Sequence, residues 1–113
     1  MTETDDTPNK YYANVVAIKD LAGYQEDSIV SRTIINRKSG TVTFFAFDQG
    51  QALSEHTAPC DALVHVLDGL VEVTVLGKPM RLKEGDMVLL PANEPHALKA
   101  INSFKMVLVM INA

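Results

Sequence analysis

The residues of this chain best suited to ligation or proton transfer are three histidines, His56, His65 and His96. An imidazole can bind a metal through one ring nitrogen, or it can donate and accept hydrogen bonds. Two imidazoles alone make a weak metal site, because non-haem iron adds a carboxylate and catalytic zinc takes three protein ligands. The chemistry available therefore depends on which side chains lie beside each histidine.

The single cysteine, Cys60, is a second candidate for chemistry. A lone thiol without a demonstrated base usually acts as a small apolar residue, so we expect Cys60 to fill space rather than serve as a nucleophile. No intrachain disulfide is possible, which suits a reducing cytosol.

Short strands are the elements that must position these side chains. Residues 71–75 and 80–83 alternate between apolar and polar types, and residues 42–47 are rich in aromatic and β-branched types. Residues 62–67 and 104–111 are nearly continuous apolar runs, which is typical of strands buried on both faces. Asp68-Gly69 predicts a hairpin between residues 62–67 and 70–76.

Only residues 14–21 are ambiguous, because their apolar spacing fits a helical turn as well as a strand. Residues 1–10 are polar and predict a frayed tail on a single domain of residues 1–113. Many short strands separated by Gly and Pro turns predict an all-β sandwich or closed barrel.

Charge and hydropathy exclude several kinds of partner. The net charge is −4 and no basic stripe is present, so nucleic acid is not an expected partner. No apolar stretch approaches the roughly 20 residues of a membrane span, and the acidic N-terminus does not resemble a signal peptide. We therefore expect a cytoplasmic protein without a membrane partner.

Two segments, residues 50–69 and 85–100, resemble the paired motifs of the cupin family. Those motifs read G-x5-H-x-H-x3-E-x6-G and G-x5-P-x-G-x2-H-x3-N. Six residues stand at the matching positions: Gly50, His56, Gly69, Gly85, Pro91 and His96. The resemblance implies a double-stranded β-helix, or jelly-roll, barrel like those of small single-domain bacterial cupins, with a pocket around His56 and His96.

The same resemblance shows where a metal site is incomplete. Metal-binding cupins use both histidines of H-x-H, the following Glu and the histidine of the second motif. This chain keeps His56 and His96 but has Ala58 and Ala62 at the other two positions. Asp61 is the nearest carboxylate, yet it should point outward if Ala62 points inward, since adjacent strand residues face opposite sides. His65 should point outward for the same reason.

Two further motif positions also differ. Ala100 replaces the asparagine of the second motif, and Asn93 replaces its glycine. Asparagine tolerates the left-handed backbone conformation that a turn can require.

Two functions follow from these residues. In the first, the barrel binds a small, largely apolar molecule, with His56 and His96 at its polar end and Ala58 and Ala62 enlarging the pocket. In the alternative, a metal-dependent oxygenase or isomerase uses His56 and His96 to hold a divalent ion, either Fe, Mn, Ni or Zn, with Asp61 or substrate atoms completing the coordination.

Association is a third expectation and is compatible with both functions. The resemblance implies a homodimer, and the apolar residues 15–18 are a candidate strand for pairing with a second subunit at a sheet edge.

Overall fold

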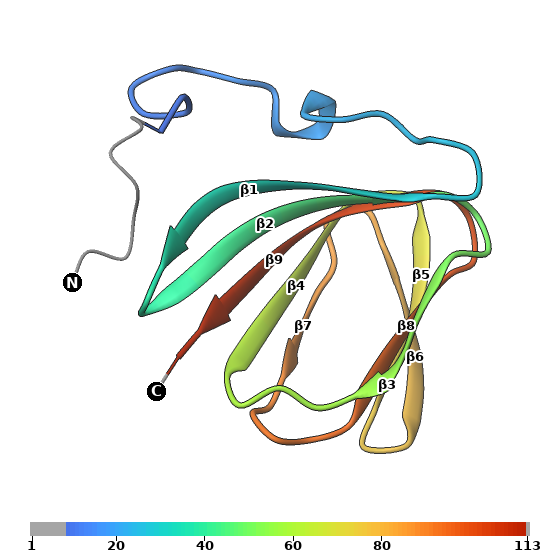
Figure 1. The fold of residues 1–113 in the computed structure, drawn as a ribbon. Helices are drawn as coiled ribbons and strands as arrows, with labels where there is room; N and C mark the ends of the chain where they lie inside the picture. Colours follow the sequence, from blue (N-terminus) through green and yellow to red (C-terminus); the bar gives the residue numbers. More distant parts are fainter. Residues whose placement is uncertain (1–8, 113) are drawn as a thin grey trace.

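Two antiparallel β-sheets face each other and enclose the core (Figure 1). The computed structural model describes residues 9–112, so the predicted tail of residues 1–10 lies largely outside the described residues. The large sheet has the order β1-β2-β9-β4-β7 and the small sheet has the order β3-β8-β5-β6. This is the predicted all-β jelly-roll architecture.

Within the described residues, every long element is a strand. Their bounds are β1 Ile29–Arg37, β2 Gly40–Phe47, β3 Ala52–His56, β4 Asp61–Asp68, β5 Leu70–Val75, β6 Lys78–Lys83, β7 Met87–Leu90, β8 His96–Ala100 and β9 Phe104–Ile111. The ambiguous residues 14–21 contain only a short 3-10 helix, η1, at Ile18–Asp20. No helix among residues 9–112 is long and apolar enough to cross a membrane.

Alternation along the strands builds the core between the sheets. In β5, Val71, Val73 and Val75 are buried while the residues between them are partly exposed. Within the large sheet, the rings of Phe47 at the end of β2 and Phe104 at the start of β9 lie side by side with centroids 4.7 Å apart, and both side chains are fully buried. Aromatic pairs at this separation add to the burial of apolar area, so this pair strengthens the contact between β2 and β9 on the inner side of the large sheet.

The predicted hairpin at Asp68-Gly69 is wrong. β4 pairs with β7 and β9 in the large sheet, whereas β5 pairs with β6 and β8 in the small sheet. Gly69 instead forms the corner at which the chain passes from one sheet to the other, with φ at +82°. A Cβ atom there would lie 1.9 Å from the carbonyl oxygen of Ser103. Glycine is needed because the backbone of the next corner passes directly beside it.

The prediction that residues 62–67 and 104–111 are buried on both faces is also wrong for the chain by itself. Their inward side chains are buried, but on the outward side His65 is exposed and Ile111 is 62% exposed. The reason is that no element of residues 9–112 forms a second layer over much of the outer face of the large sheet, as Figure 1 shows for β4, β7 and β9.

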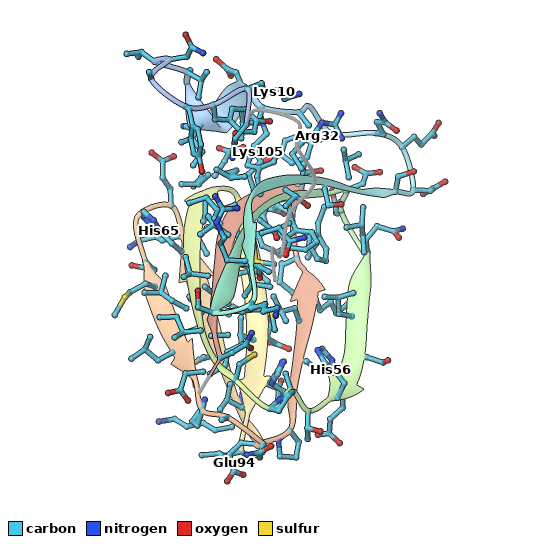
Figure 2. All side chains as sticks on the ribbon, turned by 60° about the vertical axis from the view of Figure 1, so that its left-hand side comes forward. Lys10, Arg32, His56, His65, Glu94 and Lys105 are labelled. Carbon is cyan, nitrogen blue, oxygen red and sulfur yellow. The ribbon has the colours of Figure 1, made fainter. Side chains whose placement is uncertain are left out.

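The N-terminal segment, residues 9–28, covers the remaining part of that face (Figures 1 and 2). Leu21 and Ala22 pack against the buried Phe44 and Ala46 of β2. The Lys105 ammonium donates to the carbonyl oxygen of Lys19 at 2.5 Å. Asn9 donates from its side chain to the carbonyl oxygen of Ile34 at 2.6 Å, so the predicted tail is already attached to β1 at this residue.

A second attachment of this segment is the Tyr24 hydroxyl, which donates to the Asp68 carboxylate at the end of β4. Burial, followed by the hydrogen bond and the charge of Asp68, raises the pKa of Tyr24 above its ordinary value. The folded state therefore favours the neutral phenol.

We predict that Gly69→Ala destabilises the fold much more than Gly85→Ala. Both glycines have positive φ, which costs alanine about 1–2 kcal/mol. Only Gly69 also has backbone atoms against its Cβ position, whereas nothing lies within 4 Å at Gly85. We expect a loss of about 2–5 kcal/mol for Gly69→Ala, measured by urea unfolding. Equal losses in the two variants would contradict this explanation.

The Tyr24 contact predicts a dependence of stability on alkaline pH. Because the pKa of Tyr24 is raised in the folded state, its contribution is complete below the unfolded value of about 10 and is lost as the pH rises above it. The difference in unfolding free energy between wild type and Tyr24→Phe should therefore be complete at about pH 8 and smaller at about pH 11, with the loss beginning near pH 10. If this free-energy difference stays constant over the range, the hydrogen bond to Asp68 does not raise the pKa of Tyr24 in the folded state.

Candidate functional site

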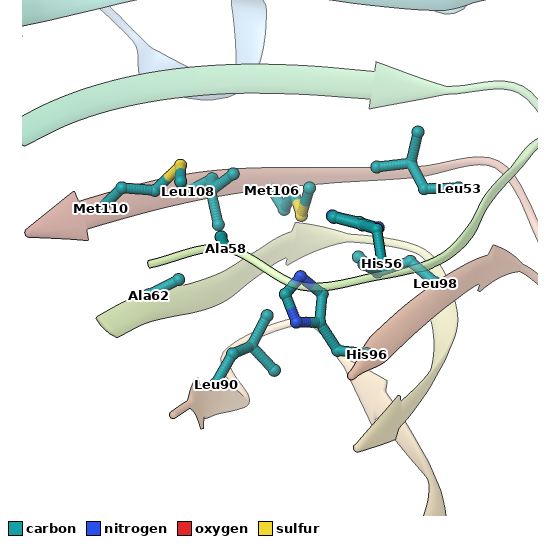
Figure 3. Close-up of a pocket in the computed structure, with 10 residues that line it drawn as sticks. All are labelled: Leu53, His56, Ala58, Ala62, Leu90, His96, Leu98, Met106, Leu108 and Met110. Carbon is teal, nitrogen blue, oxygen red and sulfur yellow. The ribbon is translucent and has the colours of Figure 1, made fainter. Parts of the chain in front are cut away.

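The two motif histidines meet across a pair of neighbouring strands. His56 is the last residue of β3, His96 is the first residue of β8, and the strand register pairs them directly. Their ring centroids are 4.3 Å apart and the rings meet edge to face at 67° (Figure 3). His96 is buried, with 7% of its surface exposed, whereas His56 is exposed. The pair thus extends from the interior of the barrel, at His96, to the solvent-exposed surface, at His56.

Hydrogen bonds to backbone carbonyls determine which nitrogen of each imidazole ring carries the proton. The Nδ1 atom of His56 lies 2.8 Å from the carbonyl oxygen of Ser54, and that of His96 lies 3.2 Å from the carbonyl oxygen of Glu94. A carbonyl oxygen only accepts hydrogen bonds, so each Nδ1 must be the protonated nitrogen. In the neutral rings the Nε2 atoms, which lie farthest from the backbone, are left with lone pairs. The pair therefore offers two acceptors.

Beside the histidines is a cavity of about 60 Å³ between the two sheets. One water molecule needs roughly 10–15 Å³ on this measure, and a cavity of about 150 Å³ is known to hold benzene. The space therefore suits several waters or a small organic group. The lining is apolar apart from the two imidazoles, and it consists of Leu53, His56, Ala58, Ala62, Leu90, His96, Leu98, Met106, Leu108 and Met110 (Figure 3).

All four residues predicted for the pocket, His56, Ala58, Ala62 and His96, line this cavity. Ala62 faces inward from β4 and is only 6% exposed. Ala58 lies in the loop before β4, where its carbonyl oxygen accepts a hydrogen bond from the Asn93 amide at 2.7 Å. That bond connects the two motif segments at the rim of the cavity.

Asn93 has φ at +67°, so asparagine does adopt the left-handed conformation expected where the family motif has glycine. The departure from the motif therefore leaves the turn between β7 and β8 intact.

The other candidate side chains lie outside the cavity, as strand alternation predicts. Asp61 is exposed, and its Oδ1 atom accepts a hydrogen bond from the Ala92 amide at 2.9 Å. His65 is exposed on the outer face of β4, far from His56 in Figure 2. Cys60 is buried in the loop before β4, which agrees with a space-filling role.

The residues present do not fit a complete metal centre. Across residues 9–112, no group of three or more His, Cys, Asp and Glu side chains is placed to hold one ion. The methyl groups of Ala58 and Ala62 stand where ligands would be needed, and Asp61 is turned toward a backbone amide. Two imidazoles would leave most of the coordination sphere to water.

Sequence reasoning did not assign most of the apolar lining. Met106, Leu108 and Met110 occupy alternate, inward positions of β9, and this alternation is hidden in the sequence because the residues between them are also apolar. Met87, by contrast, is 57% exposed on the outer side of β7.

Known proteins share both the sequence pattern and the fold. The family model described as the cupin domain matches residues 43–112. A conserved Streptococcus pyogenes protein of unknown function is 33% identical, with 98% of this chain and 97% of that chain covered and a TM-score of 0.87. No curated protein matches at a significant level.

Two further solved structures are similar. A cupin 2 conserved barrel domain protein from Leptotrichia buccalis is 40% identical, with a TM-score of 0.81 over 83% of this chain and 46% of that chain. A cupin superfamily protein from Desulfitobacterium hafniense has a TM-score of 0.87 at 22% identity, over 94% of this chain and 97% of that chain. With the family model covering more than half of its length, this chain belongs to the cupin family.

Proposed function

We propose that this cupin barrel binds a small, largely apolar molecule that carries a hydrogen-bond donor. The observation that carries the proposal is the pair of imidazoles at one end of an otherwise apolar cavity, each with Nδ1 committed to a backbone carbonyl. A hydroxyl or amine would find an acceptor at Nε2, and its hydrocarbon part would contact the leucine and methionine side chains.

The two alanines support binding in place of metal chemistry. Ala58 and Ala62 remove two side chains that would otherwise fill this region, and they leave apolar methyl groups on the cavity wall. The enclosed space suits a group of a few non-hydrogen atoms, and a larger ligand would extend past the exposed His56 toward solvent.

The donor requirement can be tested with two isomers, butan-1-ol and methyl propyl ether. Both have the same number of non-hydrogen atoms, but only the alcohol donates a hydrogen bond. We expect the alcohol to bind about 2–10-fold more tightly, the range given by one net hydrogen bond. The measurement is a two-dimensional amide NMR titration of the whole protein, followed at the residues that line the cavity.

His56→Phe keeps a ring at the same position and removes one of the two acceptors, so it should reduce the preference for the alcohol. His65→Phe changes a histidine outside the cavity and is the matched control. Equal affinities for the two isomers in the wild type would refute the donor requirement.

A substitution that fills the cavity should weaken ligand binding while changing the stability of the fold only slightly. Ala62→Val adds two methyl groups to the wall of the cavity, so we expect it to lower affinity for butan-1-ol at least 10-fold while changing stability by less than about 1.5 kcal/mol. Ala100→Val is the control, because Ala100 is 1% exposed in the packed core and outside the cavity lining. Overpacking there should cost about 1–3 kcal/mol in urea unfolding. Unchanged alcohol binding in Ala62→Val would place the ligand elsewhere.

The metal-dependent enzyme is the runner-up, and the same protein tests it. Thermal shift measurements with Fe²⁺, Mn²⁺, Ni²⁺ and Zn²⁺ should show no stabilisation that depends on His56, whereas binding of an organic ligand should raise the melting temperature. Stabilisation by a metal that disappears in both His56→Ala and His96→Ala would overturn the proposal in favour of the enzyme.

A further inference from the structure

One side chain of the cavity has a chemistry that the binding of an organic ligand does not use. Met106 is an inward residue of β9, only 1% exposed, and its thioether lines the cavity together with His56 and His96. In Figure 3 the ring of His96 points from β8 toward the side chains of His56 and Met106, whereas Met110 lies at the far end of the cavity. The Met106 sulfur thus adds a soft, polarisable atom to the two imidazoles.

Met106 is not part of the incomplete site that the family motifs describe. It lies outside both motif segments, residues 50–69 and 85–100, and those motifs contain no sulfur ligand. Sulfur ligands select soft ions such as Cu(I), and imidazole also suits copper. Two nitrogens and one thioether sulfur therefore form a ligand set for a different class of ion from Fe, Mn, Ni or Zn in their divalent states.

The charge of the cavity also favours a monovalent ion. The cost of moving an ion out of water scales with the square of its charge, so a singly charged ion bears about a quarter of the cost of a doubly charged ion of the same size. Among residues 9–112, no carboxylate lines the cavity to offset a second charge. The feature that makes this cavity unsuitable for a divalent centre is therefore compatible with an ion of charge +1.

The hydrogen bonds of both histidines are those of metal ligands. A histidine that binds a metal donates its other ring N–H to a carboxylate, a backbone carbonyl or water, and this bond orients the ring. Here the Nδ1 atoms of His56 and His96 donate to the carbonyl oxygens of Ser54 and Glu94. The ring centroids are 4.3 Å apart, which is close enough for both Nε2 atoms to reach one ion through bonds of about 2.0–2.1 Å.

We propose that His56, His96 and Met106 bind one Cu(I) ion, through two Nε2 atoms and one thioether sulfur. The cavity of about 60 Å³ has room for several waters and therefore for a single ion. His56 is exposed, so the ion enters past its ring. This inference goes beyond the organic ligand, because an alcohol or amine needs the Nε2 acceptors but not the sulfur.

Cys60 is the competing soft ligand. Its thiol is buried in the loop before β4 and is not part of the cavity lining. Cys60→Ala removes the only thiol of the chain, so binding at the proposed site should be the same in wild type and in this variant.

The test is a titration of the full-length protein with Ag⁺, a soft monovalent ion that is stable in air, in chloride-free buffer. Methionine labelled with ¹³C at its methyl group gives a separate NMR signal for each thioether. We expect the Met106 signal to shift and to saturate, in wild type and in Cys60→Ala. The signal of Met87, 57% exposed on the outer side of β7, should not move. A titration with Cu(I) and ascorbate under nitrogen then checks the proposed ion itself.

Met106→Leu preserves the apolar character of the side chain and removes its sulfur. We expect it to weaken Ag⁺ binding at least about 10-fold, since the loss of even an outer partner of a metal ligand costs about 10–100-fold. Met87→Leu makes the same change outside the cavity and is the matched control. Circular dichroism establishes that each variant is folded. Should Met106→Leu fail to fold, His56→Phe removes a nitrogen ligand at an exposed position and should weaken binding in the same way.

Equal affinities for Ag⁺ in wild type and Met106→Leu would overturn the proposal, and so would loss of binding in Cys60→Ala. The organic ligand is tested separately. A wild type that binds butan-1-ol but not Ag⁺ refutes the copper site alone. A wild type that binds Ag⁺ but does not distinguish butan-1-ol from methyl propyl ether refutes only the donor requirement of the proposed function.

Discussion

The alternation of side chains along each strand is the constraint from which the pocket, the core and the outer surface all follow. On β4 it turns Ala62 and Val64 into the barrel and turns Asp61 and His65 outward. A shift of one residue would exchange these sets and would place a carboxylate inside the cavity. The register of β4 against β7 and β9 prevents this shift. The absence of a carboxylate from the pocket is thus a property of the sheet, and no local rearrangement of side chains can reverse it.

The corners of the barrel give this register its stability. Gly69 lets the chain leave the large sheet and enter the small one while lying against the backbone of Ser103 and Phe104. The same corner is the last fixed position of the first family motif. The first motif therefore has a structural part at Gly69 that does not depend on the two ligands that this chain lacks.

At the pocket, two weakly polar rings sit among apolar side chains. The backbone carbonyls of Ser54 and Glu94 orient both imidazoles in the same sense, so the polar end of the cavity acts as an acceptor. The opposite side of the large sheet instead exposes apolar side chains, among them Met87 and Leu89. The two surfaces of this sheet thus differ in chemistry: the inner one borders a cavity with two imidazoles at one end, and the outer one is largely apolar around Met87 and Leu89.

The sequence by itself determined the all-β class, the positions of the two motif segments and the outward direction of Asp61 and His65, because alternation and turn residues are local properties. The resemblance of the two segments to the family motifs also implied that His56 and His96 lie together. Only the tertiary structure decided that Gly69 is a corner between sheets, since a tight turn looks the same in either role. Only the structure revealed which side of β9 lines the cavity. Both sides of this strand are apolar, so nothing in its sequence distinguishes a pocket wall from an outer surface.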